Sequence, residues 1–233
     1  MTLFPRYENS TDELLGGSDA ATRALSVTAV ETGFVEDVYE KLASVYDYTF
    51  GPTLHPGRLT AIRRLGISQG DRILEVGVGT GINVALYPQD CQITGIDLSD
   101  SMLEKARSRV ARHGVRNVRL LQMDAAALKF PDNSFDIVYA PYVISVVPDP
   151  VQVVSEMRRV CRHGGRFILL NHFLSANRLL SRIERIISPM TVHIGFKSDL
   201  DLPAFLAQAE LRPESIEKVN IPKIWSLVTC VKN

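Results

Sequence analysis

The chain of 233 residues suits one large domain with a substantial core, and 45% of its residues are hydrophobic, as is typical of a globular protein. Its 26 basic and 26 acidic residues balance, so the chain as a whole does not favour nucleic acid or another polyanion, and attraction to phosphates requires local clusters. Three scattered cysteines lack the spacing of metal ligands and indicate a reducing compartment without a disulfide framework.

The N-terminal segment lacks the features of a signal peptide. Its first residues, "MTLFPRYENSTDELLGG", have no apolar core, and no run in the chain approaches the roughly 20 apolar residues that cross a bilayer. We therefore expect a cytosolic protein, or one that lies on a membrane without crossing it. From about residue 27 to residue 50, apolar residues recur at helical spacing. This pattern predicts a helical cap or membrane-binding segment over residues 1–50, followed by one domain over residues 51–233.

Strand-like and helical stretches alternate through the rest of the chain. One helix is expected to begin at a Ser99 cap and stop at Gly114, and another to begin with Pro150 in its first turn and end at Gly164. The alternation predicts an α/β fold, in which helices cover both faces of a mostly parallel sheet. The last two strands are expected to form a hairpin-like pair at its edge. The predicted strands are residues 72–77, 92–97, 118–123, 135–140, 166–171, 215–221 and 225–233.

A glycine-rich turn, "EVGVGTG", follows the first predicted strand. Its glycines are Gly77, Gly79 and Gly81, and Glu75 precedes them. Ligands of open α/β sheets bind beyond the carboxyl ends of the strands, where glycine lets them approach the main chain. The spacing G-x-G-x-G differs from the G-x-G-x-x-G of dinucleotide-binding proteins. By itself, such a turn is also compatible with a simple connection from strand to helix.

Two acidic residues strengthen the prediction of a nucleotide site. Asp97 ends the second predicted strand, where it can accept hydrogen bonds from both hydroxyls of a ribose. Asp124 follows the third strand, where an acidic side chain can meet an adenine amino group. A glycine turn together with acids at the ends of two neighbouring strands is more specific than any of these features alone.

Four successive motifs resemble those of the Rossmann-like S-adenosylmethionine-dependent methyltransferases: "ILEVGVGTG", "GIDLSDSML", "MDAAAL" and "FPDNSFDIVYA". The resemblance covers the chain from about residue 39 onward. It implies a seven-stranded, mostly parallel sheet whose last strand is antiparallel, with helices on both faces and further helices at the N-terminus. It also implies S-adenosylmethionine as cofactor, S-adenosylhomocysteine as product, and no metal.

The same resemblance implies roles for individual residues. Glu75 and Gly77 would hold the methionine end of the cofactor, and Asp97 its ribose. Leu98 and Met102 would contact the adenine face, although ordinary core packing explains these two equally well. The residues implied in cofactor binding are Glu75, Gly77, Gly79, Gly81, Asp97, Leu98, Met102, Asp124 and Ala125.

A narrower resemblance rests on "VYDYTFGPTLHPGR", "YVISVVPDP", "EMRRVCRHGGRFILLNHF" and the arginine-bearing stretch that follows. Together these segments resemble the bacterial phosphatidylethanolamine N-methyltransferases. The resemblance implies stepwise methylation of phosphatidylethanolamine, through its monomethyl and dimethyl forms, to phosphatidylcholine. It also implies a cytoplasmic protein that associates peripherally with the anionic inner face of the cytoplasmic membrane.

The arginine-bearing stretch, "RLLSRIERIISP", spans residues 178–189 and is amphipathic on a helical wheel. Leucine and isoleucine lie on one side, while Arg178, Arg182 and Arg185 line up on the other. An apolar stripe of this kind can lie at acyl-chain depth while arginines meet lipid phosphates. A solvated basic face on an ordinary covering helix is the alternative. The candidate residues for binding the substrate phosphate are Arg178, Arg182, His193 and Lys197.

The acceptor amine of such a lipid titrates near pH 10 and must lose a proton before it attacks a methyl group. Aromatic faces suit the cationic groups along this series, which makes Tyr39, Tyr46 and Tyr142 candidate catalytic residues. Related phosphoethanolamine methyltransferases pair a tyrosine with a histidine after the fourth strand. The corresponding segment, "APYVISVVPD", has no histidine, and His172 is the nearest substitute. The general base stays unassigned.

Two other functions remain open at this point. Quinone C-methylating enzymes share the nucleotide motifs and also have a lipophilic acceptor. A non-catalytic membrane-surface protein with the same fold is the second alternative, but the set of Glu75, Gly77, Gly79 and Asp97 argues against a lost active site. A nicotinamide-dependent dehydrogenase is disfavoured by the glycine spacing and by the lack of a Tyr-x-x-x-Lys pair.

Overall fold

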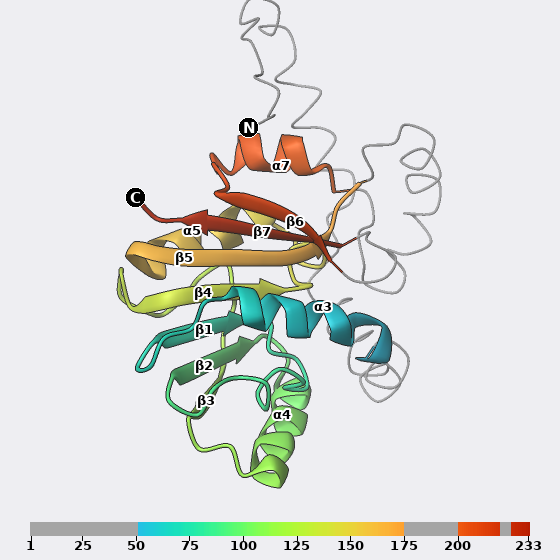
Figure 1. Ribbon diagram of the computed structural model, residues 1–233, viewed down its shortest axis with the longest axis vertical. Coiled ribbons are helices and arrows are strands. Elements are labelled where there is room, and N and C mark those ends of the chain that lie inside the picture. Colours follow the sequence, from blue (N-terminus) through green and yellow to red (C-terminus); the bar gives the residue numbers. More distant parts are fainter. Residues whose placement is uncertain (1–50, 175–199, 220–224) are drawn as a thin grey trace, which may run out of the picture.

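A seven-stranded sheet forms the centre of the computed structural model, which describes residues 51–174, 200–219 and 225–233 (Figure 1). The strand order is β3-β2-β1-β4-β5-β7-β6. The first five strands pair in parallel, and β7 pairs antiparallel with both β5 and β6. The predicted sheet is therefore confirmed. Its strands are β1 (Arg72–Val76), β2 (Gln92–Asp97), β3 (Val118–Gln122), β4 (Phe135–Pro141), β5 (Cys161–His172), β6 (Ser215–Val219) and β7 (Trp225–Val231).

Helices cover both faces of this sheet. Helix α3 (Gly51–Arg64) and α4 (Asp100–His113) lie on one face, and α5 (Pro150–Val160) and α7 (Leu202–Gln208) contribute to the core on the other (Figure 1). Successive residues of a strand point to opposite faces. In β1, Ile73 therefore packs with the residues of α3, while Leu74 and Val76 pack with those of α5.

Local signals set the ends of α4 as predicted. The Ser99 side chain accepts a hydrogen bond from the amide of Met102 at the N-cap, and Gly114 ends the helix at φ 63°. Asp149 caps α5 in the same way by accepting from the amide of Gln152, and Pro150 occupies the first turn. These caps fix the two segments that approach the carboxyl edge of the sheet.

The predicted end of the second helix, at Gly164, is wrong. Helix α5 ends at Val160, and the chain enters β5 at Cys161, which pairs with Phe135 of β4. The amide of Gly164 donates to the carbonyl of Lys232, so strand contacts, and not helical ones, satisfy this stretch. The two C-terminal strands form the predicted antiparallel pair, with β7 lying between β5 and β6.

The order of the strands reverses between β1 and β4. From β1 the sheet continues through β2 to β3, whereas β4 lies on the other side of β1 and leads to β5. Ligands of open α/β sheets bind at such a reversal, beyond the carboxyl ends of the strands. Of the helices in the described ranges, none is long and apolar enough to pass through a membrane. The predicted helical segment over residues 1–50 and the arginine-bearing stretch over 178–189 lie outside the described residues.

Candidate active site

A cavity of about 410 Å³ opens beyond the carboxyl ends of β1, β2, β3 and β4. This volume falls in the range of small-molecule sites, roughly 300–1,000 Å³. Its charged residues are three acids and one base, which suits a ligand with both positive and negative groups. Residues from five elements and their flanking segments contribute to its wall, among them Arg58, Gly77, Gly79, Asp97, Asp124 and Tyr142.

The glycine turn shapes one end of the cavity. Gly77 and Gly79 both have positive φ, at 69° and 55°, which is unfavourable for other residues. A Cβ on Gly77 would lie 2.0 Å from Cγ2 of Val143, whereas a Cβ on Gly79 would meet no atom within 4 Å. Glycine at 77 therefore serves close packing with the segment after β4. At 79 it leaves the main chain open to a ligand.

Asp97 holds the turn and faces the cavity. Its Oδ2 accepts a hydrogen bond from the amide of Gly79 (2.8 Å) and its Oδ1 from the amide of Ser99 (3.0 Å). Burial raises the pKa of Asp97, while these amides act in the opposite direction. Each carboxylate oxygen has two lone pairs, so each can accept a further hydrogen bond from a ribose hydroxyl.

The residues predicted to meet adenine line the cavity where β2 and β3 end. They are Leu98, Met102 and Asp124, and the predicted cofactor residue Ala125 follows Asp124 in the wall. Oδ1 of Asp124 accepts from the amide of Ala126 (2.8 Å), which forms a turn of the chain just after β3. The other oxygen of Asp124 remains suited to an amino group such as that of adenine.

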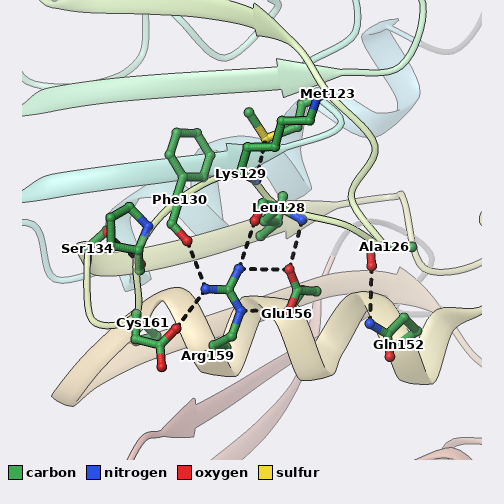
Figure 2. Close-up of polar contacts among 12 residues, drawn as sticks. Met123, Ala126, Leu128, Lys129, Phe130, Ser134, Gln152, Glu156, Arg159 and Cys161 are labelled. Carbon is green, nitrogen blue, oxygen red and sulfur yellow. Dashed lines mark hydrogen bonds and ion pairs between the residues drawn. The ribbon is translucent and has the colours of Figure 1, made fainter.

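Helix α5 fastens the loop after β3, which carries Asp124 and Ala125 (Figure 2). Arg159 donates to the carbonyls of Leu128 and Phe130, both at 2.8 Å, and forms an ion pair with Glu156. Glu156 accepts in turn from the amide of Leu128 (2.8 Å), and Gln152 donates to the carbonyl of Ala126 (3.1 Å). The polar face of α5 thereby forms hydrogen bonds with main-chain groups of the loop, which would otherwise lack hydrogen-bond partners.

Glu75 lies beneath the glycine turn and is not part of the cavity wall. Its carboxylate accepts hydrogen bonds from Nδ2 of Asn83 and from the hydroxyl of Tyr87, both at 2.6 Å. Burial raises the pKa of Glu75 from its usual 4.5 to about 7, although both hydrogen bonds and the charge of Arg58 act in the opposite direction. Of the predicted cofactor residues, Glu75 thus supports the turn from beneath, and Gly81 lies close to Ala106 of α4, while the other seven line the cavity.

Tyr142 follows β4 with an unusual backbone. Its φ is +62°, which costs free energy in a bulky residue and occurs mostly where a site requires it. Its ring packs edge-to-face against Trp225, with centroids 4.9 Å apart, and Trp225 also contacts His172 at 5.6 Å. The structure therefore places Tyr142 in the cavity wall and His172 behind Trp225, away from the wall.

Arg58 is a residue of the site to which the sequence analysis assigned no role, although the motif "VYDYTFGPTLHPGR" ends with it. It projects from α3 into the cavity wall, and its guanidinium carbon lies 4.9 Å from the centroid of the Tyr142 ring. Arg58 is followed by buried residues at positions 61, 62 and 65, so it occupies the apolar stripe of α3. An arginine at an apolar position of this helix is the sequence signal that indicates a buried, functional charge.

Several predicted residues lie outside the described residues: Tyr39, Tyr46, Arg178, Arg182, Arg185, His193 and Lys197. Their roles remain predictions. Within the described ranges, no group of three histidine, cysteine, aspartate or glutamate side chains comes together as it would around a metal ion.

The chain matches known methyltransferases over most of its length. The model of a methyltransferase domain matches residues 74–169. The phosphatidylethanolamine N-methyltransferase of Cereibacter sphaeroides is 39% identical over 183 residues, which are 78% of this chain and 89% of that protein. The demethylmenaquinone methyltransferase of Geobacillus kaustophilus is 34% identical over 58% of this chain and 62% of that protein.

A solved structure shares the fold. Phosphoethanolamine N-methyltransferase 2 of Haemonchus contortus, in complex with S-adenosyl-L-methionine, aligns with a TM-score of 0.69, at 19% identity, over 85% of this chain and 60% of that one. The cavity fits this cofactor, since Asp97 can take its ribose, Asp124 its adenine, and the open main chain at Gly79 its methionine end. The chain therefore belongs to the Rossmann-like S-adenosylmethionine-dependent methyltransferases, in the family of the bacterial phosphatidylethanolamine N-methyltransferases, and S-adenosylmethionine is its cofactor.

Proposed function

We propose that the protein methylates the amine of phosphatidylethanolamine in steps, yielding phosphatidylcholine at the membrane surface. The observation that carries this proposal is the extent of the match. The similarity to the Cereibacter phosphatidylethanolamine N-methyltransferase runs through nearly all of that protein, whereas the similarity to the quinone methyltransferase stops at about three fifths. Substrate-binding segments of these enzymes lie largely outside the shared nucleotide motifs, so a match that extends beyond them favours a common acceptor.

Bound S-adenosylmethionine supplies an electrophilic methyl group, and the chain has to bring a neutral amine in line with it. Positioning of this kind supplies a large part of the rate enhancement. The wall next to Tyr142 consists of Val143, Val146, Val147 and Pro148, which exclude water. Because apolar surroundings disfavour a charged ammonium, this wall lowers the pKa of the acceptor amine from about 10 and eases its deprotonation.

Aromatic rings are the groups we assign to the ammonium forms along the series and to the quaternary product, which carries a fixed positive charge. Tyr142 is the candidate in the cavity wall, and the predicted residues Tyr39 and Tyr46 complete the set. One face of the Tyr142 ring already receives the guanidinium of Arg58, so the acceptor would use the remaining ring surface. His172, behind Trp225, would act through the position of that ring.

The acceptor lipid requires contact with a membrane. We assign that contact to the arginine-bearing stretch, in which Arg178, Arg182, His193 and Lys197 would meet phosphates while the apolar stripe reaches acyl chains. The protein would then work peripherally on the inner face of the cytoplasmic membrane. Peripheral binding of this kind combines apolar insertion with attraction to anionic lipids.

Methylation assays with labelled S-adenosylmethionine test the proposal. Phosphatidylethanolamine and its monomethyl and dimethyl forms should each take up label, whereas phosphatidylcholine, which has no free lone pair on nitrogen, should take up none. A demethylated quinone precursor is the competing acceptor, favoured by the matches to quinone methyltransferases. Label in the quinone, with none in the three amines, would overturn the proposed acceptor in favour of carbon methylation.

A further inference from the structure

Arg58 presents a buried positive charge to the cavity. The residue is 9% exposed and lies on the face of α3 that packs on the sheet. Burying a charge costs free energy unless a counter-charge or several hydrogen bonds compensate it. The partners of this guanidinium therefore decide what it does.

Among the described residues, the hydrogen-bond donors of the guanidinium find only some of the partners that they could bind. Its Nη1 donates one long hydrogen bond, of 3.4 Å, to Oδ1 of Asn83, and its Nε has no hydrogen-bond partner within the described part of the chain. A guanidinium carries five N–H donors in a rigid fork that matches carboxylate and phosphate. Glu75, the nearby acid, directs both its oxygens to Asn83 and Tyr87. Arg58 is thus suited to a further, anionic partner.

The position of Arg58 limits the identity of that partner. Asn83, which holds Arg58, follows the glycine turn and also donates to Glu75 of β1. Arg58 therefore lies beside the glycine turn after β1, whereas Asp124 and Ala125 follow β3, two strands away in the sheet. The methionine end of S-adenosylmethionine carries a carboxylate, and the proposed phospholipid acceptor carries a phosphate. Either oxyanion can meet a guanidinium through two parallel hydrogen bonds.

We propose that Arg58 is an oxyanion-binding residue of the cavity, which receives either the carboxylate of the cofactor or the phosphate of the acceptor lipid. The first source depends only on the cofactor of the family. The second rests on the proposed function. Asn83 and Glu75 act as positioning residues, because Asn83 accepts from the guanidinium and Glu75 fixes the amide of Asn83.

The affinity of Arg58→Gln for ligands, measured by calorimetry, distinguishes the two sources of the oxyanion. S-adenosylmethionine and 5′-methylthioadenosine share the adenosine part, but only the first has the amino-acid end. If Arg58 binds the carboxylate, Arg58→Gln should bind S-adenosylmethionine at least tenfold more weakly while its affinity for methylthioadenosine is unchanged, since hydrogen bonds to charged groups are strong. Unchanged methylthioadenosine binding also shows that the variant is folded. Arg58→Lys should recover part of the loss, because it restores the charge without the fork.

The lipid arm uses a short-chain, monomeric phosphatidylethanolamine at saturating cofactor. If Arg58 binds the phosphate, Arg58→Gln should raise the KM for this lipid at least tenfold and leave the affinity for S-adenosylmethionine unchanged. Arg63→Gln, an exposed arginine on the same helix, is the matched control and should behave as wild type in both arms. If the wild-type protein does not methylate this lipid, the proposed acceptor is refuted, while the measurements of cofactor binding still test the role of Arg58. If Arg58→Gln changes neither the affinity for S-adenosylmethionine nor the KM for the lipid, the oxyanion-binding role is overturned.

Discussion

Glu75 is a carboxyl group at 1% exposure, directly beneath the turn that forms the cavity. Charged and titratable groups approach it from every side: Arg58 from α3, Asp97 from β2, and the tyrosines at 87 and 139. Burial dominates this balance and brings the pKa of Glu75 to about 7. The residue is therefore protonated in part of the population at neutral pH, which gives its stability contribution a pH dependence.

Replacing Glu75 by glutamine should change how stability varies with pH. The pKa of Glu75 is higher in the folded state, about 7, than its usual 4.5, so folding takes up protons between these values. The wild type should lose on the order of 3 kcal/mol of unfolding free energy, relative to Glu75→Gln, as pH rises through this window. Urea unfolding of both proteins at pH 5 and pH 8 measures the difference. The same difference at both pH values would show that Glu75 titrates as an ordinary carboxyl group.

The residues of the cavity were predictable from sequence where strand ends alone determine them. Asp97 ends β2 and Asp124 comes just after β3, and parallel strands bring their carboxyl ends to one edge. Arg58 was not predictable in this way, because its place depends on how α3 packs over the sheet. Glu75 was predicted as a cofactor residue at this turn, and the structure adds that β1 directs its side chain toward Asn83 and Tyr87, which the sequence pattern did not reveal. Its role toward the cofactor stays a prediction.

At the scale of elements, α5 acts on the site without contributing most of its wall. Its polar face binds the main chain of the loop after β3, through Arg159, Glu156 and Gln152 (Figure 2). Arg159 joins two carbonyls of that loop to the helix, and Asp132 pairs with it from the far end of the loop. The part of the cavity wall at Asp124 and Ala125 thus depends on a helix that is packed against β4 and β5.

Arg159→Gln should weaken both the fold and the cofactor site. Loss of these hydrogen bonds should lower the unfolding free energy by about 1.5–3 kcal/mol, the range of hydrogen bonds to charged groups. Because the freed loop carries Asp124 and Ala125, the affinity for S-adenosylmethionine should fall as well, by several-fold. Arg158→Gln is the matched control, since Arg158 is exposed and contacts the carbonyl of Glu210 at 3.5 Å. Equal effects of the two substitutions in urea unfolding and calorimetry would refute the fastening role.

Elements with strong local signals were predicted closely. The serine cap and the terminal glycine fixed α4, and apolar runs fixed the strands. The end of α5 was missed, because the register between β4 and β5 recruits Cys161 to the sheet, which no local pattern reveals. Helix α3 was not predicted either. It contains Pro56 and Gly57 in its interior, and its contacts with the sheet outweigh these propensities.

At the scale of the whole molecule, charge is balanced, with 26 basic and 26 acidic residues. A protein without net charge gains little from general attraction to an anionic membrane. Electrostatic binding to a membrane must then come from one surface, and the sequence offers Arg178, Arg182 and Arg185 on one side of an amphipathic stretch. If a local cluster of arginines binds the membrane, only its own substitution should weaken binding, whereas an effect of net charge should be the same wherever an arginine is replaced. Substitutions can therefore separate the two causes.

Replacing Arg178, Arg182 and Arg185 by glutamine should reduce binding to vesicles that contain anionic lipid. Each basic residue near such a surface contributes about 1 kcal/mol, and salt should screen this contribution, because the Debye length falls to about 3 Å at 1 M. The matched control replaces the exposed residues Arg112, Arg116 and Arg119, which changes the net charge by the same amount. Cosedimentation with vesicles at low and high salt should show a salt-sensitive loss for the first set and near wild-type binding for the second. Equal losses for both sets would mean that net charge, and not the arginine-bearing stretch, brings the protein to the membrane.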